Sequence, residues 1–199
     1  CVFLAITSAS GSESQRVRFG PGVCGPVDPV YIKVATETGG QPFPVSPAEV
    51  GQSSRVMKSS LLPEMILWAS GNSEDSYLIP VDPSVVRIMF SGTFDATGGS
   101  LTLTAPDGTV IQQGDRIEDT PLNCGRIITV DAPASGTWQV RTAPTGRFWL
   151  RVRAKSGLSL RDAEFVEPDA GPESDRLVEI QGEPIAGRPA TLRVSVSST

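Results

Sequence analysis

The spacing of apolar and polar positions changes about one third of the way along the chain. Residues 2–6 form a short apolar run, typical of a central strand that is covered on both faces. The Asp-Pro pair at residues 28–29 provides a capping side chain and a proline at the first helical position, and two glycines at residues 39–40 end the predicted helix. Residues 43–45 form a second short strand. This order predicts a parallel sheet covered by helices.

A second helix is predicted directly after that strand. Ser46 and Glu49 have the spacing of a capping box, and Pro47 occupies the first helical position. One strand-helix-strand-helix unit cannot bury both faces of its own strands, so either the chain is a fragment or another molecule completes the sheet. We therefore expect another polypeptide, or a second copy, to cover the apolar positions of this segment. These positions are Val2, Leu4, Ile6, Val30, Val34 and Phe43.

From residue 65 onward, short apolar-alternating runs recur between turn residues, which predicts an antiparallel sandwich. Pro106-Asp107-Gly108 is expected to form a hairpin turn. The candidate strands are residues 65–70, 76–80, 85–91, 100–105, 109–112, 126–130, 136–141, 147–154 and 158–165.

Trp138 is the strongest candidate for the core of this sandwich, because a turn delivers it onto a strand in which it alternates with outward positions. On the strand at residues 147–154, Trp149, Arg151 and Arg153 alternate with apolar positions. We expect that face to be solvated, with binding of an anionic partner as the alternative, and we expect Trp149 to be exposed. The predicted core residues are Trp138, Phe148, Leu150, Leu103 and Ile88.

Four stretches of the chain resemble a known pair of neighbouring modules. Cys-Val-Phe-Leu-Ala-Ile-Thr at residues 1–7 and Val-Tyr-Ile-Lys-Val-Ala-Thr-Glu-Thr-Gly-Gly-Gln-Pro-Phe at residues 30–43 are similar to the end of a von Willebrand factor A domain. Tyr-Leu-Ile-Pro-Val-Asp-Pro-Ser at residues 77–84 and Ala-Ser-Gly-Thr-Trp-Gln-Val at residues 134–140 resemble the module that follows that domain in hemicentin-type extracellular proteins. The acidic, proline-rich residues 167–174 predict a linker. Strands at residues 176–180 and 191–196 then resemble the opening hairpin of an immunoglobulin-like repeat.

The resemblance implies a mainly β chain with a short α/β N-terminal portion. Its expected parts are an A-domain-like portion (residues 1–62), a sandwich (63–166), a linker (167–174) and the start of an immunoglobulin-like domain (175–199). The implied function is a non-enzymatic, extracellular or cell-surface adhesion or structural module, a spacer or scaffold beside an A domain. The alternative is a subunit of a self-assembling extracellular fibre or sheath that pairs through open sheet edges.

The composition of the chain excludes several classes of catalytic and binding site. The chain has no histidine, which excludes Ser-His-Asp, Cys-His and His-ligated metal sites, and it has no glycine-rich phosphate loop. We expect no enzyme activity and no cofactor. The net charge of −5 and the lack of basic-aromatic clusters argue against nucleic acid, and the apolar runs are too short to span a membrane. The expected partner is protein: the missing part of the A domain or another subunit, with self-assembly possible.

Metal binding has little support in the sequence. The A-domain adhesion motif, Asp-x-Ser-x-Ser, has no counterpart and would fall before Cys1, so we predict no divalent-metal dependence of the adhesion type. The weak calcium candidates are expected in polar loops of the sandwich, where Glu118 and Asp119 are expected to be solvated, and they lack Asp-x-Asp-x-Asp spacing. They are Asp95, Asp107, Asp115 and Asp119.

Three cysteines, Cys1, Cys24 and Cys124, have no Cys-x-x-Cys spacing, so a zinc site is not expected. In an oxidising compartment, Cys24 and Cys124 are the best candidates for a disulfide because both lie in glycine-flanked, loop-like stretches. Three free or buried thiols are the alternative. Cys1 as a lipidated first residue is less consistent with a strand that starts there.

Overall fold

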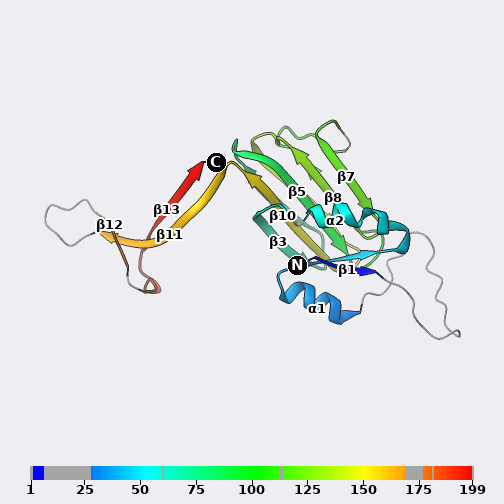
Figure 1. Ribbon diagram of the computed structural model, residues 1–199, viewed down its shortest axis with the longest axis horizontal. Coiled ribbons are helices and arrows are strands. Elements are labelled where there is room, and N and C mark those ends of the chain that lie inside the picture. Colours follow the sequence, from blue (N-terminus) through cyan, green and yellow to red (C-terminus); the bar gives the residue numbers. More distant parts are fainter. Residues whose placement is uncertain are drawn as a thin grey trace. The chain divides into compact units, whose positions relative to one another are not determined.

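Strands make up most of the described chain, and the helices are confined to its opening part (Figure 1). The computed structural model describes residues 2–6, 28–59, 61–112, 114–168, 177–180 and 182–198. This confirms the predicted mainly β fold with a short α/β portion. The elements are β1 (Val2–Ile6), α1 (Pro29–Glu37), β2 (Gln41–Val45), the 3-10 helix η1 (Pro47–Gln52), α2 (Ser53–Ser59), β3 (Glu64–Gly71), β4 (Asp75–Val81), β5 (Val85–Phe94), β6 (Ser100–Thr104), β7 (Ile117–Leu122), β8 (Gly125–Asp131), β9 (Gly136–Ala143), β10 (Phe148–Ser156), β11 (Leu158–Pro168), β12 (Leu177–Glu179) and β13 (Thr191–Ser198).

The chain divides into two compact units, residues 1–155 and 156–199. No unit boundary falls at residue 62, since the opening α/β segment packs on the sandwich through Phe43 and Val56. None falls at residue 166 either, because β11 belongs to the second unit. That residues 1–62 derive from an A domain stays a prediction. None of the helices in the described ranges is long and apolar enough to cross a membrane.

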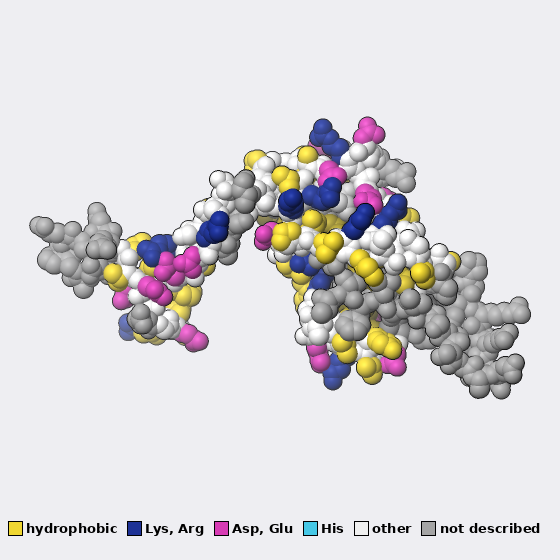
Figure 2. Space-filling model, in the orientation of Figure 1, with side chains coloured by type: hydrophobic (Ala, Val, Ile, Leu, Met, Phe, Trp, Pro, Cys, Tyr) yellow, Lys and Arg dark blue, Asp and Glu magenta, His cyan; other side chains and the backbone are white. Residues whose placement is uncertain are grey.

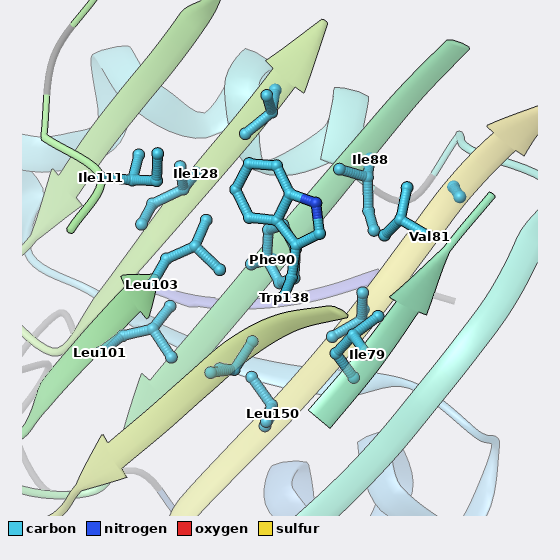
Figure 3. Packing of buried hydrophobic residues seen from close by; sticks show 14 of the residues in the cluster. Ile79, Val81, Ile88, Phe90, Leu101, Leu103, Ile111, Ile128, Trp138 and Leu150 are labelled. Carbon is cyan, nitrogen blue, oxygen red and sulfur yellow. The ribbon is translucent and has the colours of Figure 1, made fainter. Parts of the chain in front are cut away.

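The sandwich consists of a five-stranded sheet, in the order β3-β10-β5-β8-β7, and a three-stranded sheet, β4-β9-β6. The main hydrophobic cluster draws on both sheets. Trp138 lies within it, 2% exposed, with its ring centroid 6.0 Å from that of Phe90 (Figure 3). The indole N–H donates to the carbonyl oxygen of Ala134 at 2.9 Å, so the buried polar atom is satisfied. All five proposed core residues are buried in this cluster: Trp138, Phe148, Leu150, Leu103 and Ile88.

Most strands of the sandwich follow the predicted pattern, and β7 is the main exception. The prediction of a polar loop at Glu118 and Asp119 is wrong, because both residues lie on β7. This strand is at the edge of its sheet and contains Pro121, which an edge strand tolerates because one side of its backbone needs no partner. Residues 109–112 were expected to form a strand, but they contribute only an isolated bridge between Val110 and Thr104.

The opening segment has the predicted order and strand direction. β1 pairs with β2 in parallel, with α1 between them in the chain. The Asp28 side chain caps α1 by accepting from the Val30 backbone N–H at 2.9 Å. Gly39, with φ of 67°, follows the end of the helix, as the glycine pair predicted. η1 and α2 follow β2, so the predicted second helix begins as a 3-10 turn.

The second unit contains a three-stranded sheet in the order β12-β11-β13. The strands predicted near residues 176–180 and 191–196 exist as β12 and β13, but they do not pair as a hairpin. Both pair with β11, which lies between them. The prediction that residues 158–165 form a strand of the sandwich is therefore wrong, since those residues belong to the central strand of this separate sheet. Most of the linker predicted at residues 167–174 lies outside the described residues.

Candidate functional site

The most distinctive surface of the first unit is the outer face of the five-stranded sheet, meaning the face turned away from the sandwich core. There, β2 and α2 lie against the sheet. Phe43 and Val56, 3% and 0% exposed, pack with Met89 of β5 and Ile127 of β8 in a second hydrophobic cluster. The expectation that another chain covers Phe43 is therefore wrong: the sandwich of the same chain covers it. Val30 of α1 remains 62% exposed.

Gln41 provides the first polar anchor of this contact. Its Nε2 donates to the carbonyl oxygens of Ser91 and Trp149, at 3.1 and 3.0 Å, and to Thr93 Oγ1 at 3.1 Å. Its Oε1 accepts from Ser91 Oγ at 3.0 Å. A glutamine that is 2% exposed thus joins β2 to both β5 and β10. Because the amide is satisfied, its burial fixes the position of β2 on the sheet without a large desolvation penalty.

Glu49 provides the second polar anchor, at the other end of β2. Its carboxylate accepts from the backbone N–H of Ser46 at 2.8 Å, which completes the predicted capping box. It also accepts from the backbone N–H of Asn123 at 2.6 Å and from the Asn123 side-chain amide at 3.1 Å. Asn123 lies in the hairpin between β7 and β8, so one carboxylate both caps η1 and attaches it to the sandwich. The sequence indicated only the capping role.

The outer face of β10 differs from its prediction. Trp149, expected to be exposed, is only 2% exposed, and Arg151 is 7% exposed. Gln41 of the opening segment hydrogen-bonds to the Trp149 carbonyl, so β2 lies beside Trp149, a position that alternation alone assigned to water. The Arg147 guanidinium carbon lies 6.0 Å from the centroid of the Trp149 ring, within range of a cation–π contact. The predicted solvated arginine face is therefore wrong at Arg151.

A small hollow with a volume of about 60 Å³ lies between α2 and the sheet. Its charged lining residues are partly neutralised, because Arg55 pairs with Glu118 at 3.4 Å and Arg87 pairs with Asp131. The Asp131 carboxylate raises the pKa of Arg87 above its ordinary value. Figure 2 shows Lys and Arg side chains interspersed with acidic and hydrophobic ones over the region of α2. The hollow is lined by Arg55, Lys58, Leu62, Arg87, Met89, Glu118, Thr120, Ile127 and Thr129.

Three of the four calcium candidates have a local hydrogen-bonding role. Asp95 accepts from the Arg147 backbone N–H at 2.6 Å, and Asp119 forms a bidentate pair with Arg126, at 3.0 and 2.9 Å. Asp107 accepts from the Thr109 backbone N–H at 2.9 Å within the predicted turn, and hydrogen bonds from Thr109 hold its pKa below the ordinary value. Asp115 is exposed. Within the described ranges, no three His, Cys, Asp or Glu side chains gather as a metal site would require.

Cys124 lies in the β7–β8 hairpin, 2% exposed, and is disulfide-bonded. The alternative considered from the sequence was three free or buried thiols. The bond at Cys124 excludes it. Cys1 and Cys24 lie outside the described residues, so the pairing of Cys24 with Cys124 stays a prediction. The bond places a covalent constraint next to Asn123, the residue that Glu49 holds.

The sequence did not indicate the exposed apolar edge of the five-stranded sheet. β3 is the strand at that edge, and Met65, Ile66 and Trp68 on it are 45%, 38% and 47% exposed. Leu67 and Ala69 point the other way and pack on the main core. Alternation of Ile66 and Trp68 with Leu67 and Ala69 was the available signal, but it does not say which set faces the core. A shift in the pairing register with β10 at Ile66 breaks the alternation before Met65.

None of the family models compared with the chain matches it. The chain is similar to hemicentin-1 of Mus musculus, 23% identical over 163 residues that cover 78% of the chain. It is also similar to hemicentin-1 of Homo sapiens, 22% identical over 138 residues that cover 66% of it. The matched regions span only 3% and 2% of those two much longer proteins.

One solved structure is similar to part of this chain. It is the lipase BlEst2 of Bacillus licheniformis in its propeptide form, with a TM-score of 0.36 and 14% identity over 60% of this chain and 31% of that one. A likeness at this TM-score carries no argument about fold or activity. The similarity that bears on this chain is therefore the one to hemicentin-1, which agrees with the resemblance seen in the motifs.

Proposed function

We propose that this chain is a non-enzymatic extracellular module that acts as a scaffold beside a von Willebrand factor A domain. The observation that carries the proposal is the docking of β2, η1 and α2 on the sandwich through Gln41, Phe43, Val56 and Glu49. A segment resembling the end of an A domain is thus held in one orientation by buried contacts at both ends of β2. A flexible tether would have no need for such contacts.

Two further observations support an extracellular role. The similarity to hemicentin-1 runs over most of the chain. In addition, Cys124 is disulfide-bonded, and structural disulfides persist mainly in oxidising compartments. The exposed Val30 and Tyr31 of α1, 62% and 51%, provide a surface that the remainder of an A domain would cover.

A second function is favoured by the exposed edge strand β3. Met65, Ile66 and Trp68 lie on an eight-residue strand at the edge of its sheet, and such strands pair readily with another chain. The second unit adds exposed apolar side chains on β13: Leu192, Val194 and Val196. In this alternative the chain is a subunit of a self-assembling extracellular fibre or sheath.

Size-exclusion chromatography with light scattering distinguishes the two functions. The scaffold predicts a mass of 21.0 kDa at every concentration. Assembly predicts a mass that grows with concentration, abolished by Ile66→Lys on the edge strand but not by Val86→Lys. Val86 is the matched control because it is 48% exposed yet lies on β5, inside the sheet. Filaments of the parent chain that disappear only with Ile66→Lys would overturn the scaffold.

A further inference from the structure

We propose that the outer face of β10 and β3 binds an acidic polysaccharide, in which Arg151 holds an oxyanion group, carboxylate or sulfate, and Trp68 stacks on a sugar ring. This site is separate from the docking contacts that carry the scaffold function. It rests on three features of the two strands. Arg151 is a buried cation without a partner, Arg153 is a neighbouring cation, and the exposed indole of Trp68 lies directly across from Arg151.

Arg151 is the unusual residue of the pair of strands. It is 7% exposed, its Nε has no hydrogen-bond partner, and no ion pair involves it among the residues that the structure describes. Burial, reinforced by the nearby charge of Arg153, lowers the pKa of Arg151 from its ordinary value. A buried guanidinium without an anion is destabilising, so its presence points to an anion that binds from outside.

The surroundings of Arg151 favour a negative ligand. β10 carries Arg151, Arg153 and Lys155 and no acidic residue, and β3 carries a single acid, Glu64. Arg151 and Arg153 are two positions apart, about 7 Å along a strand. The positive charge of Arg153 therefore adds to the attraction that Arg151 has for a polymer with repeated anionic groups.

Trp68 supplies the second half of the site. It is the direct cross-strand partner of Arg151, so their Cβ atoms lie about 5 Å apart and both side chains are on the outer face. Trp68 is 47% exposed on the edge strand, which leaves the indole open from the side. The sequence suggested Trp149 as the exposed tryptophan, but the structure assigns that position to Trp68.

A flat indole beside a guanidinium fits a sugar ring that carries an acidic substituent. The aromatic face packs on the apolar face of the ring, and the planar guanidinium forms a bidentate pair with carboxylate or sulfate oxygens. Because Arg151 is only 7% exposed, the group that reaches it must be small. An acidic protein surface is the competing source of a carboxylate, and the experiment includes it.

The test is isothermal titration calorimetry of the whole chain at physiological ionic strength with three probes. A heparin octasaccharide carries sulfates and carboxylates, a hyaluronan octasaccharide carries carboxylates alone, and a poly-glutamate peptide of equal charge represents a protein. The variants are Arg151→Gln and Trp68→Ala, with Arg188→Gln, an exposed arginine of the second unit, as the control.

The proposal predicts that at least one octasaccharide binds, that Arg151→Gln and Trp68→Ala each weaken binding about tenfold, and that Arg188→Gln leaves it unchanged. Thermal melting of Arg151→Gln should occur at or above the parent midpoint, since a buried unpaired charge is removed. If Arg151→Gln does not fold, the glycan affinity of Trp68→Ala, a change at an exposed position, decides whether the proposal holds. Absence of glycan binding, equal weakening by Arg188→Gln, unchanged affinity of Trp68→Ala, or equally tight Arg151-dependent binding of poly-glutamate would overturn the proposal.

Discussion

Gln41 shows how much one side chain contributes to the position of the opening segment. Its amide makes four hydrogen bonds to Ser91, Thr93 and Trp149 while 2% exposed. Gln41→Met keeps the size of the side chain but leaves those partners unsatisfied, so we expect a loss of about 1 to 3 kcal/mol in the free energy of unfolding. Chemical denaturation measures it. Gln139→Met is the control: Gln139 is exposed and its side-chain amide donates to Ser76 Oγ on the surface, so a change within about 0.5 kcal/mol is expected.

Trp138 tests the sandwich core at the same scale. The side chain is 2% exposed, packs near Phe90 and satisfies its N–H on Ala134. Trp138→Ala removes this packing and leaves a cavity, so we expect a loss of about 3 to 5 kcal/mol, enough to unfold a module of ordinary stability. A folded variant with an unchanged denaturation midpoint would show that the core assignment is wrong.

Ionisation of Tyr77 is expected to lower the free energy of unfolding at alkaline pH. Burial, then the hydrogen bond and charge of Asp75, raise the pKa of Tyr77 to about 12. A phenol whose pKa is higher in the folded chain contributes stability that is complete below the unfolded value, about 10, and lost as pH rises towards 12. Absorbance titration of a Tyr31→Phe chain should show the remaining phenol ionising near pH 12, and Tyr77→Phe should lack this contribution. Ionisation of Tyr77 near pH 10 would contradict both its burial and its interaction with Asp75.

At the scale of elements, features that depend on residues close in sequence were predicted correctly, and features that depend on tertiary contacts were not. The capping side chain of Asp28, the capping box at Ser46 and Glu49, and the turn at Asp107 depend on neighbours within a few residues, and the structure contains all three. The outer face of β10 depends on β2, which is more than a hundred residues away in the chain. No alternation pattern contains that contact, so Trp149 was assigned to water.

The β7–β8 hairpin is the element that the disulfide constrains. Cys124 is buried there beside Asn123, which Glu49 holds. Cys124→Ser removes the cross-link, and we expect a loss of about 2 to 5 kcal/mol in the free energy of unfolding. Denaturation of the parent chain in reductant should match the variant. If neither change moves the midpoint, the disulfide has no structural role.

At the scale of the whole molecule, the two units differ in how completely their sheets are covered. The first has two layers around one core, and Phe43 and Val56 of its opening segment pack on Met89 and Ile127 of one sheet's outer face. The second has a single three-stranded sheet with exposed apolar positions, among them Leu192 and Val194. The scaffold function depends on the first unit and on the contact between its opening segment and its sandwich.

Native-state hydrogen exchange followed by mass spectrometry tests that contact most directly. If the opening segment is docked, amides of β2 and α2 should exchange with opening free energies close to those of β5 and β8, because the buried contacts of Gln41 and Phe43 join them in one cooperative unit. Gln41→Met should speed exchange in β2 and α2 more than in β8. Full exchange of β2 and α2 in the parent chain, while β5 and β8 stay protected, would contradict the scaffold.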